Sequence, residues 1–202
     1  RRFIDAGSGL PTAENTHQIA QRANLSCSVV YVDNDPSVVA HGRALLLDND
    51  RTHFVAADLT KPDEVLADPA IADLLAPGEP VALVMGLMLH HIADYEQTLE
   101  IARKYVDALP PGSYLAITHA CNPGDGGAVD VLVTELAEKI KPAFPTLAFR
   151  TVEQISSLFG DMEILEPGVV RLVDWHVPGG RIDEEPEPGV RDAIYGGVGR
   201  KR

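Results

Sequence analysis

Short apolar runs alternate with longer stretches of helical periodicity along most of the chain. The runs are rich in β-branched and aromatic residues and are bounded by Gly, Pro, Asp or Asn, which is typical of strands. The predicted strands cover residues 1–5, 28–33, 52–58, 81–86 and 113–120. The predicted helices between them cover residues 12–22, 36–46, 62–75 and 94–109. Strands that alternate with helices indicate right-handed crossovers and a parallel sheet with helices on both faces.

The last third of the chain breaks this alternation. Helices are predicted at 129–140 and 151–159, followed by two strand-like segments, "MEILEPGVVRLVDWH" and "AIYGGVGRK". Only the acidic, proline-rich loop "PGGRIDEEPEPG" joins these two segments, so we expect them to pair antiparallel. The sequence therefore predicts an α/β, Rossmann-like fold with a seven-stranded, mostly parallel sheet and one antiparallel strand.

Composition narrows the classes of partner. The 202 residues suffice for a single domain, and the formal net charge is −13. Such a surface repels phosphate backbones and anionic lipid, so we expect neither nucleic acid nor membrane as a partner. No apolar stretch is long enough to span a bilayer and no signal peptide opens the sequence, which favours a cytoplasmic location. Cys27 and Cys121 lack the spacing of a zinc site.

Candidate site residues follow from the fold class. In an open α/β sheet, ligands bind beyond the carboxyl ends of the strands, near the point where the strand order reverses. The residues at or just after these ends are Asp5, Gly7, Ser8, Gly9, Asp33, Asn34, Asp58, Leu59, Met85, Gly86 and His119.

The first of these ends carries the stretch "DAGSGLPT". Gly7 and Gly9 permit backbone conformations closed to other residues and leave room for a ligand. A dinucleotide site would place a third glycine where Thr12 stands, and Asp5 would repel a pyrophosphate. A ligand with an amino group and a positive centre would be attracted instead. The stretch favours a cationic nucleoside, with an NAD(P)-dependent oxidoreductase as the alternative.

The next two strand ends supply matching acceptors. Asp33 lies about two dozen residues beyond the glycines, a spacing that suits a carboxylate accepting both ribose hydroxyls. Asp58 can accept from an adenine amino group, while the backbone N–H of Leu59 can donate to a ring nitrogen. Asn15, near the start of the first helix, is a further candidate for cofactor contact. Together with the glycine loop, these residues predict a nucleoside site.

The same residues carry a family resemblance. "DAGSGLP", "VDNDP", "AADLT" and "MLHHI" resemble successive motifs of class I S-adenosylmethionine-dependent methyltransferases. "GLPTAENTH", "VVYVDNDPSVVAHGRALL" and "YGGVGRK" resemble the bacterial S-adenosyl methyltransferase family of unassigned substrate, over essentially the whole chain. The resemblance implies the class I methyltransferase fold and S-adenosyl-L-methionine as cofactor. It also implies that Asp5, Gly7 and Gly9 hold the methionine part, Asp33 the ribose, and Asp58 with Leu59 the adenine.

Members of that family usually begin with a further helical segment. We therefore expect residues 1–202 to be a single S-adenosylmethionine-binding domain that lacks this segment. The expected activity is methyl transfer to an unidentified acceptor, a small molecule given the acidic surface. A non-enzymatic regulator that binds the cofactor is a second alternative, and the sequence leaves the oligomeric state open.

Three histidines are candidates for the chemistry. His90 and His91 follow the fourth strand beside the expected methyl group, and His119 lies near the end of the fifth strand. One of them, with His91 preferred, would act as a base or orient the acceptor. The competing interpretation packs one of the pair under the next helix and exposes the other. His17 is expected to brace the glycine loop, and a metal site formed by the three histidines and Cys121 has no supporting ligand spacing.

Overall fold

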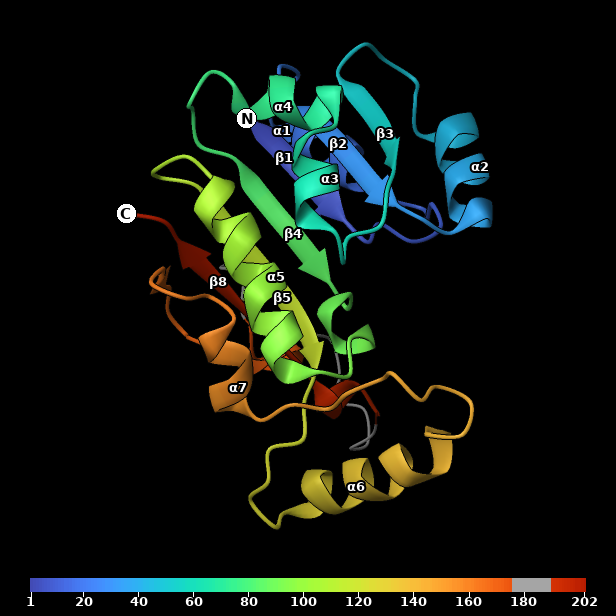
Figure 1. Cartoon of the computed structure of the whole chain (residues 1–202), viewed down its shortest axis with the longest axis vertical. Helices are drawn as coiled ribbons and strands as arrows, with labels where there is room; N and C mark the ends of the chain where they lie inside the picture. Colours follow the sequence, from blue (N-terminus) through green and yellow to red (C-terminus); the bar gives the residue numbers. More distant parts are fainter. Residues whose placement is uncertain (176–189) are drawn as a thin grey trace.

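The computed structural model describes residues 1–175 and 190–202, and Figure 1 shows their arrangement. The strands are β1 (Arg2–Ala6), β2 (Ser28–Asp33), β3 (Thr52–Ala56), β4 (Ala82–Gly86), β5 (Tyr114–Ala120), β6 (Glu163–Ile164), β7 (Val170–Arg171) and β8 (Ile194–Arg200). The α-helices are α1 (Thr16–Ala23), α2 (Pro36–Leu45), α3 (Pro62–Leu66), α4 (Pro69–Leu75), α5 (Tyr95–Ala108), α6 (Ala128–Ile140) and α7 (Val152–Ser157). Single 3₁₀ turns cover Leu89–His91, Leu172–Asp174 and Val190–Ala193.

The sheet follows the order β3-β2-β1-β4-β5-β8-β6, with β7 pairing separately with β8. Strands β1 to β5 run parallel, and β8 pairs antiparallel with β5 in the register His119↔Tyr195. The predicted mostly parallel sheet with an antiparallel strand near its end is confirmed. Because β1 lies between β2 and β4, the strand order reverses at β1, and the crevice for a ligand opens there.

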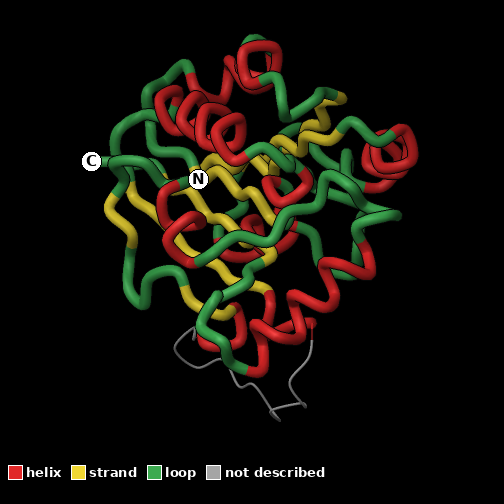
Figure 2. The backbone as a smooth tube through the Cα atoms, turned by 60° about the horizontal axis from the view of Figure 1, so that its bottom comes forward, coloured by secondary structure: helices red, strands yellow, loops and turns green. Residues whose placement is uncertain are grey.

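Helices lie on both sides of the sheet, as Figure 2 shows, but the two apolar layers differ in size. One face carries a large core in which α3, α4, α5 and the end of α7 pack against the strands, with Ile71, Leu83 and Leu115 almost fully buried. The other face has a small cluster of Val29, Tyr31 and Leu46, covered from α1 and α2. Most of the burial that stabilises the fold therefore lies on the α5 side.

Two predicted helices differ from the structure in their boundaries. The first helix begins at Thr16 rather than at residue 12, because the Asn15 backbone N–H and side-chain amide bond to Gln18 and form its start. The predicted helix 62–75 is split, because Asp68 caps a second helix that begins at Pro69. Before the first of these two helices, Thr60 donates through its backbone N–H and its hydroxyl to Asp58 Oδ1.

The predicted antiparallel pair at the end of the chain exists in a reduced form. Only the two-residue strands β6 and β7 of the segment 162–176 pair with β8, and a turn separates them. The acidic loop "PGGRIDEEPEPG" lies outside the described residues. In the part of the chain that the structure describes, no helix has the length and apolar character needed to cross a membrane.

Candidate functional site

A cavity of about 550 Å³ lies at the carboxyl ends of β1 to β4. Seven of the predicted residues line it, namely Gly7, Gly9, Asp33, Asn34, Asp58, Leu59 and His91. The cavity is also lined by Asp35, Val38, Thr60, Leu87, Met88 and Ile92. The three predicted nucleoside elements and one predicted histidine thus meet in a single cavity, with a size typical of small-molecule sites.

The glycine loop has its conformation for two different reasons. Gly7 has φ of 79°, and a Cβ atom there would lie 3.0 Å from the Cβ of Met88, so both the backbone and the space require glycine. Gly9 has φ of 63° but open space around it, so only the backbone requires glycine. Its N–H donates to Asp33 Oδ2 at 3.0 Å, which ties the loop to the end of β2. The loop presents bare backbone to the cavity.

Two of the three carboxylates that line the cavity, those of Asp33 and Asp58, accept hydrogen bonds from backbone amides. Besides Gly9, Asp33 accepts at Oδ1 from the backbone N–H of Asp35 at 3.0 Å. Asp58 accepts at Oδ1 from the backbone N–H and the hydroxyl of Thr60, at 2.9 and 2.7 Å. These two bonds lower the pKa of Asp58. Both side chains are therefore oriented acceptors at neighbouring strand ends.

Asp5 does not line the cavity; it lies behind the glycine loop. Its Oδ2 accepts from the Thr16 hydroxyl at 2.5 Å, and burial raises the pKa of this carboxyl. Tyr31 lies nearby, and its hydroxyl accepts from the backbone N–H of His17 and contacts His17 Nδ1 at 2.9 Å. Burial raises the pKa of Tyr31 to about 12. These buried polar contacts join β1, β2 and the start of α1. The bracing role of His17 at the glycine loop stays a prediction.

Four other predicted cofactor residues lie away from the cavity lining. Asn15 exchanges hydrogen bonds with the backbone of Thr12 and starts α1, so its amide is already used. The side chain of Met85 is fully buried in the core, because alternation along β4 points it away from the ligand crevice. Ser8 has a buried hydroxyl with no partner in the described part of the chain, and Gly86 does not reach the cavity. The sequence predicted the strand ends that meet at the cavity, but it did not separate the residues that line the cavity from these neighbours that do not.

The three candidate histidines occupy different environments. His91 is exposed at the cavity, whereas His90 and His119 are buried. The rings of His90 and His91 lie 4.2 Å apart between centroids, and those of His90 and His119 lie 5.8 Å apart. Of the three, only His91 is placed to contact a ligand in the cavity.

Burial also fixes the charge of the two interior histidines. It lowers the pKa of His90 to about 3, with the charges of His91, His119 and Arg150 adding to the effect. Burial likewise lowers the pKa of His119 to about 4. Its Nδ1 lies 2.7 Å from the carbonyl oxygen of Ala120, which only accepts, so this nitrogen carries the proton. Both interior imidazoles are neutral at pH 7. Across residues 1–175 and 190–202, no cluster of side chains is arranged to bind a metal ion.

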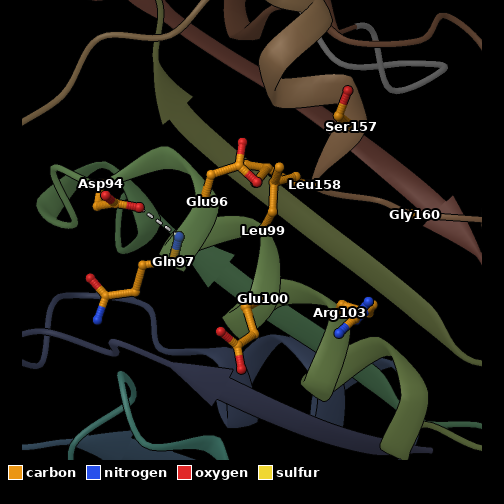
Figure 3. A pocket seen from close by; sticks show the side chains of 9 residues that line it. All are labelled: Asp94, Glu96, Gln97, Leu99, Glu100, Arg103, Ser157, Leu158 and Gly160. Carbon is orange, nitrogen blue, oxygen red and sulfur yellow. Dashed lines mark hydrogen bonds between the residues drawn. The ribbon is translucent and has the colours of Figure 1, made fainter.

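A larger hollow of about 740 Å³ lies elsewhere, between α5 and the end of α7 (Figure 3). Acidic and amide side chains of α5 and its cap surround much of it, among them Asp94, Gln97 and Glu100. Asp94 already accepts from the backbone N–H of Gln97 at 2.8 Å. No glycine loop and no β1–β3 strand end reaches this hollow. The residues predicted to bind a nucleoside therefore line the smaller cavity and not this hollow.

Comparison with known proteins shows the family of the chain. The sequence profile of the family described as S-adenosyl methyltransferase matches residues 1–202. A methyltransferase candidate from Thermobifida fusca YX is 36% identical, with a TM-score of 0.87 over 100% of this chain and 73% of its own. A DUF574 family protein from Streptomyces avermitilis MA-4680 is 33% identical, with a TM-score of 0.85 over 100% of this chain and 76% of its own. No curated protein is detectably similar to the chain in sequence.

More distant structures share the fold. The N-methyltransferase NodS from Bradyrhizobium japonicum WM9, solved in complex with S-adenosyl-L-homocysteine, is 11% identical, with a TM-score of 0.58 over 99% of this chain and 77% of its own. The sheet order with its antiparallel β8 is the class I methyltransferase fold. The whole-chain family match decides against the NAD(P)-dependent oxidoreductase considered from the sequence. The chain belongs to the S-adenosyl methyltransferase family, whose cofactor is S-adenosyl-L-methionine.

Proposed function

We propose that this S-adenosylmethionine-dependent methyltransferase acts on a small-molecule acceptor and that the cavity at the ends of β1 to β4 is where the transfer occurs. The proposal rests on the observation that one cavity is lined by Gly7, Asp33, Asp58 and His91. Three of these residues suit an adenosyl ligand, and the fourth is an exposed titratable group beside them.

The residues present fit the cofactor. In this proposal Asp33 accepts from the ribose hydroxyls, and Asp58 accepts from the adenine amino group while the Leu59 N–H donates to the ring. The bare backbone at Gly7 and Gly9 leaves room for the methionine part, for which both carboxylates provide a negative environment. The apolar side chains of Leu59, Met88 and Ile92 would cover the adenine and ribose.

When bound, S-adenosylmethionine supplies a methyl group already activated by the positive sulfur. The protein then needs mainly to align the acceptor and exclude water, and such proximity accounts for about 7–11 kcal/mol of a barrier. His91 would orient the acceptor or, if the attacking group is a hydroxyl, take its proton on an imidazole nitrogen. Neither ring nitrogen of His91 is in a hydrogen bond within the described residues, so the imidazole is available for this task.

Two observations favour a small acceptor. The net charge of −13 disfavours docking of nucleic acid through its phosphates. The cavity volume of about 550 Å³ leaves limited room beside a bound cofactor, which suits a metabolite rather than a folded macromolecule.

The test uses S-adenosylmethionine with a radioactive methyl group and an extract divided into small metabolites, proteins and nucleic acids. We expect enzyme-dependent label in the small-metabolite fraction, lost with His91→Gln and Asp33→Ala. His53→Gln, which changes an exposed histidine away from the cavity, is the matched control. Label only in protein or nucleic acid would contradict the small-molecule proposal. Tight cofactor binding with no labelled product in any fraction would instead support a regulatory role.

A further inference from the structure

Arg150 is a buried cation that the proposed chemistry does not use. Arg150 comes after the loop that follows α6. Its backbone pairs alongside the end of β5, through hydrogen bonds with Ala120 and Asn122. Its residue exposure is only 2%. No carboxylate within the described residues forms an ion pair with it. Burying a charge without a partner ion is costly, so its hydrogen bonds must offset that cost.

The guanidinium of Arg150 donates four hydrogen bonds. Two go to the loop after β4, and the other two go to side chains of β5 and α5. Nη1 donates to the Leu89 carbonyl oxygen at 3.2 Å and to His119 Nε2 at 2.7 Å. Nη2 donates to the Ile92 carbonyl oxygen at 2.7 Å and to Thr98 Oγ1 at 2.8 Å. The guanidinium thus bonds both ends of the single 3₁₀ turn Leu89–His91, in a geometry that only a planar fork of donors supplies.

The other side of the same loop faces the cavity. Leu87, Met88, His91 and Ile92 line it, and Leu87 has φ of 51°, a conformation unusual for a residue other than glycine. The Leu87 N–H donates to the backbone carbonyl and the hydroxyl of Thr118, both at 3.0 Å. A loop with an unfavourable backbone conformation persists only where the surrounding contacts hold it. Residues with such strained backbones are common at functional sites.

We propose that Arg150 is a positioning residue, which fixes the loop 87–92 from behind so that His91 and the apolar wall of the cavity keep their places. Arg150 acts through Leu89, Ile92 and His119 and does not itself reach the cavity. The inference deepens the proposed function, on which it rests for the role of His91. It gives the buried guanidinium a supporting role behind the proposed site, although Arg150 follows β5 by some 30 residues.

The test compares the wild-type chain with Arg150→Lys, Thr98→Val and Arg103→Lys. Arg150→Lys keeps the charge but not the fork, and Thr98→Val removes one acceptor of the guanidinium. Arg103→Lys is the matched control on the exposed face of α5. Calorimetry measures the Kd of S-adenosylhomocysteine, and ¹⁵N NMR follows the ring of His91, assigned with His91→Gln. Thermal unfolding shows how much folded protein is present at the working temperature.

For Arg150→Lys we expect the Kd to rise about tenfold and the His91 signals to broaden or split, while the protein stays folded. Thr98→Val should raise the Kd about threefold, and Arg103→Lys should change neither quantity. If Arg150→Lys only lowers Tm, with Kd and His91 signals like those of the wild type, Arg150 is merely a core residue and the inference is wrong. If the wild-type chain fails to bind S-adenosylhomocysteine, the cavity assignment fails instead. If Arg150→Lys does not fold, Thr98→Val decides by the same two measurements.

Discussion

The two halves of the cavity are built in opposite ways. On the side of the glycine loop, which we propose for the cofactor, the ends of β1 to β3 present polar groups to the cavity, with Asp33 and Asp58 held by backbone amides. On the side that we propose for the acceptor, the polar groups beyond β4 and β5 are mostly turned inward. His90 and His119 are buried and neutral, and only His91 reaches the cavity.

The difference shows how each half can contribute. A carboxylate that is open to the cavity recognises a ligand directly, so its removal should lower affinity without a large effect on folding. A buried imidazole or guanidinium acts through the shape of the loop that it holds, so its removal should change stability and loop geometry together. The following variants test that contrast.

The largest effect on affinity is expected for Asp33→Ala. In the proposed site Asp33 bonds two ribose hydroxyls, so its loss should weaken S-adenosylmethionine binding about 100-fold, measured by calorimetry. Asp73→Ala, which removes the same charge from an exposed position on α4, should leave the affinity unchanged. Equal affinities for both variants would show that the cofactor lies elsewhere.

Gly7 lies where the two halves of the cavity touch. Gly7→Ala should therefore lower the free energy of unfolding more than Gly9→Ala does. Both substitutions place a side chain at positive φ, but only the first also meets Met88. We expect the free energy of unfolding to fall by about 3 kcal/mol for Gly7→Ala and about 1 kcal/mol for Gly9→Ala, measured by urea denaturation. A larger loss for Gly9→Ala would contradict the close packing of the glycine loop on Met88.

The buried histidines should make the protein sensitive to acid. Their pKa values are about 3 and about 4 in the folded state, below the ordinary value of 6.5. Between pH 6.5 and 4 the unfolded chain therefore binds more protons, and the free energy of unfolding falls as the pH falls. This contribution is fully present above pH 6.5 and changes by up to about 1.4 kcal/mol per pH unit for each group.

Urea denaturation across this pH range measures that slope. His119→Gln should reduce it, whereas His53→Gln should not, because His53 is exposed. An unchanged slope for His119→Gln would mean that His119 is protonated in the folded state or titrates normally.

The smallest effect is expected for Thr60→Ala, which removes the hydroxyl bond to Asp58 but keeps the backbone bond. The pKa of Asp58 should rise toward its ordinary value, and S-adenosylmethionine affinity should fall about threefold at pH 7. Thr60→Ser keeps the hydroxyl and should bind like the wild type. A tenfold loss for both variants would indicate that the Thr60 methyl group, rather than its hydroxyl, matters.

The sequence predicted the parallel core of the fold because its signals are local. Strand and helix boundaries from residue 28 to 56 depend on β-branched runs, Pro36 and the cap Asp35, and the structure follows them closely. The split at Pro69 and the late start of α1 were missed. They depend on which side chain captures which amide, a choice that periodicity does not encode.

The candidate site, like the fold, could be predicted from the sequence only in part. Strand ends located Gly7, Asp33 and Asp58, because topology alone brings them together. Arg150 was not predictable, since it follows β5 by some 30 residues and reaches Leu89 only through the packed fold. The φ of 51° at Leu87 likewise leaves no mark in the sequence, where glycine would have indicated it.

A crystal structure of the chain with S-adenosylhomocysteine would show where the cofactor binds. We expect the ribose hydroxyls within hydrogen-bonding distance of Asp33, the adenine between Asp58 and Leu59, and the sulfur on the side of the cavity that His91 lines. Ligand density in the hollow between α5 and α7, with the cavity at the ends of β1 to β4 left empty, would contradict this expectation.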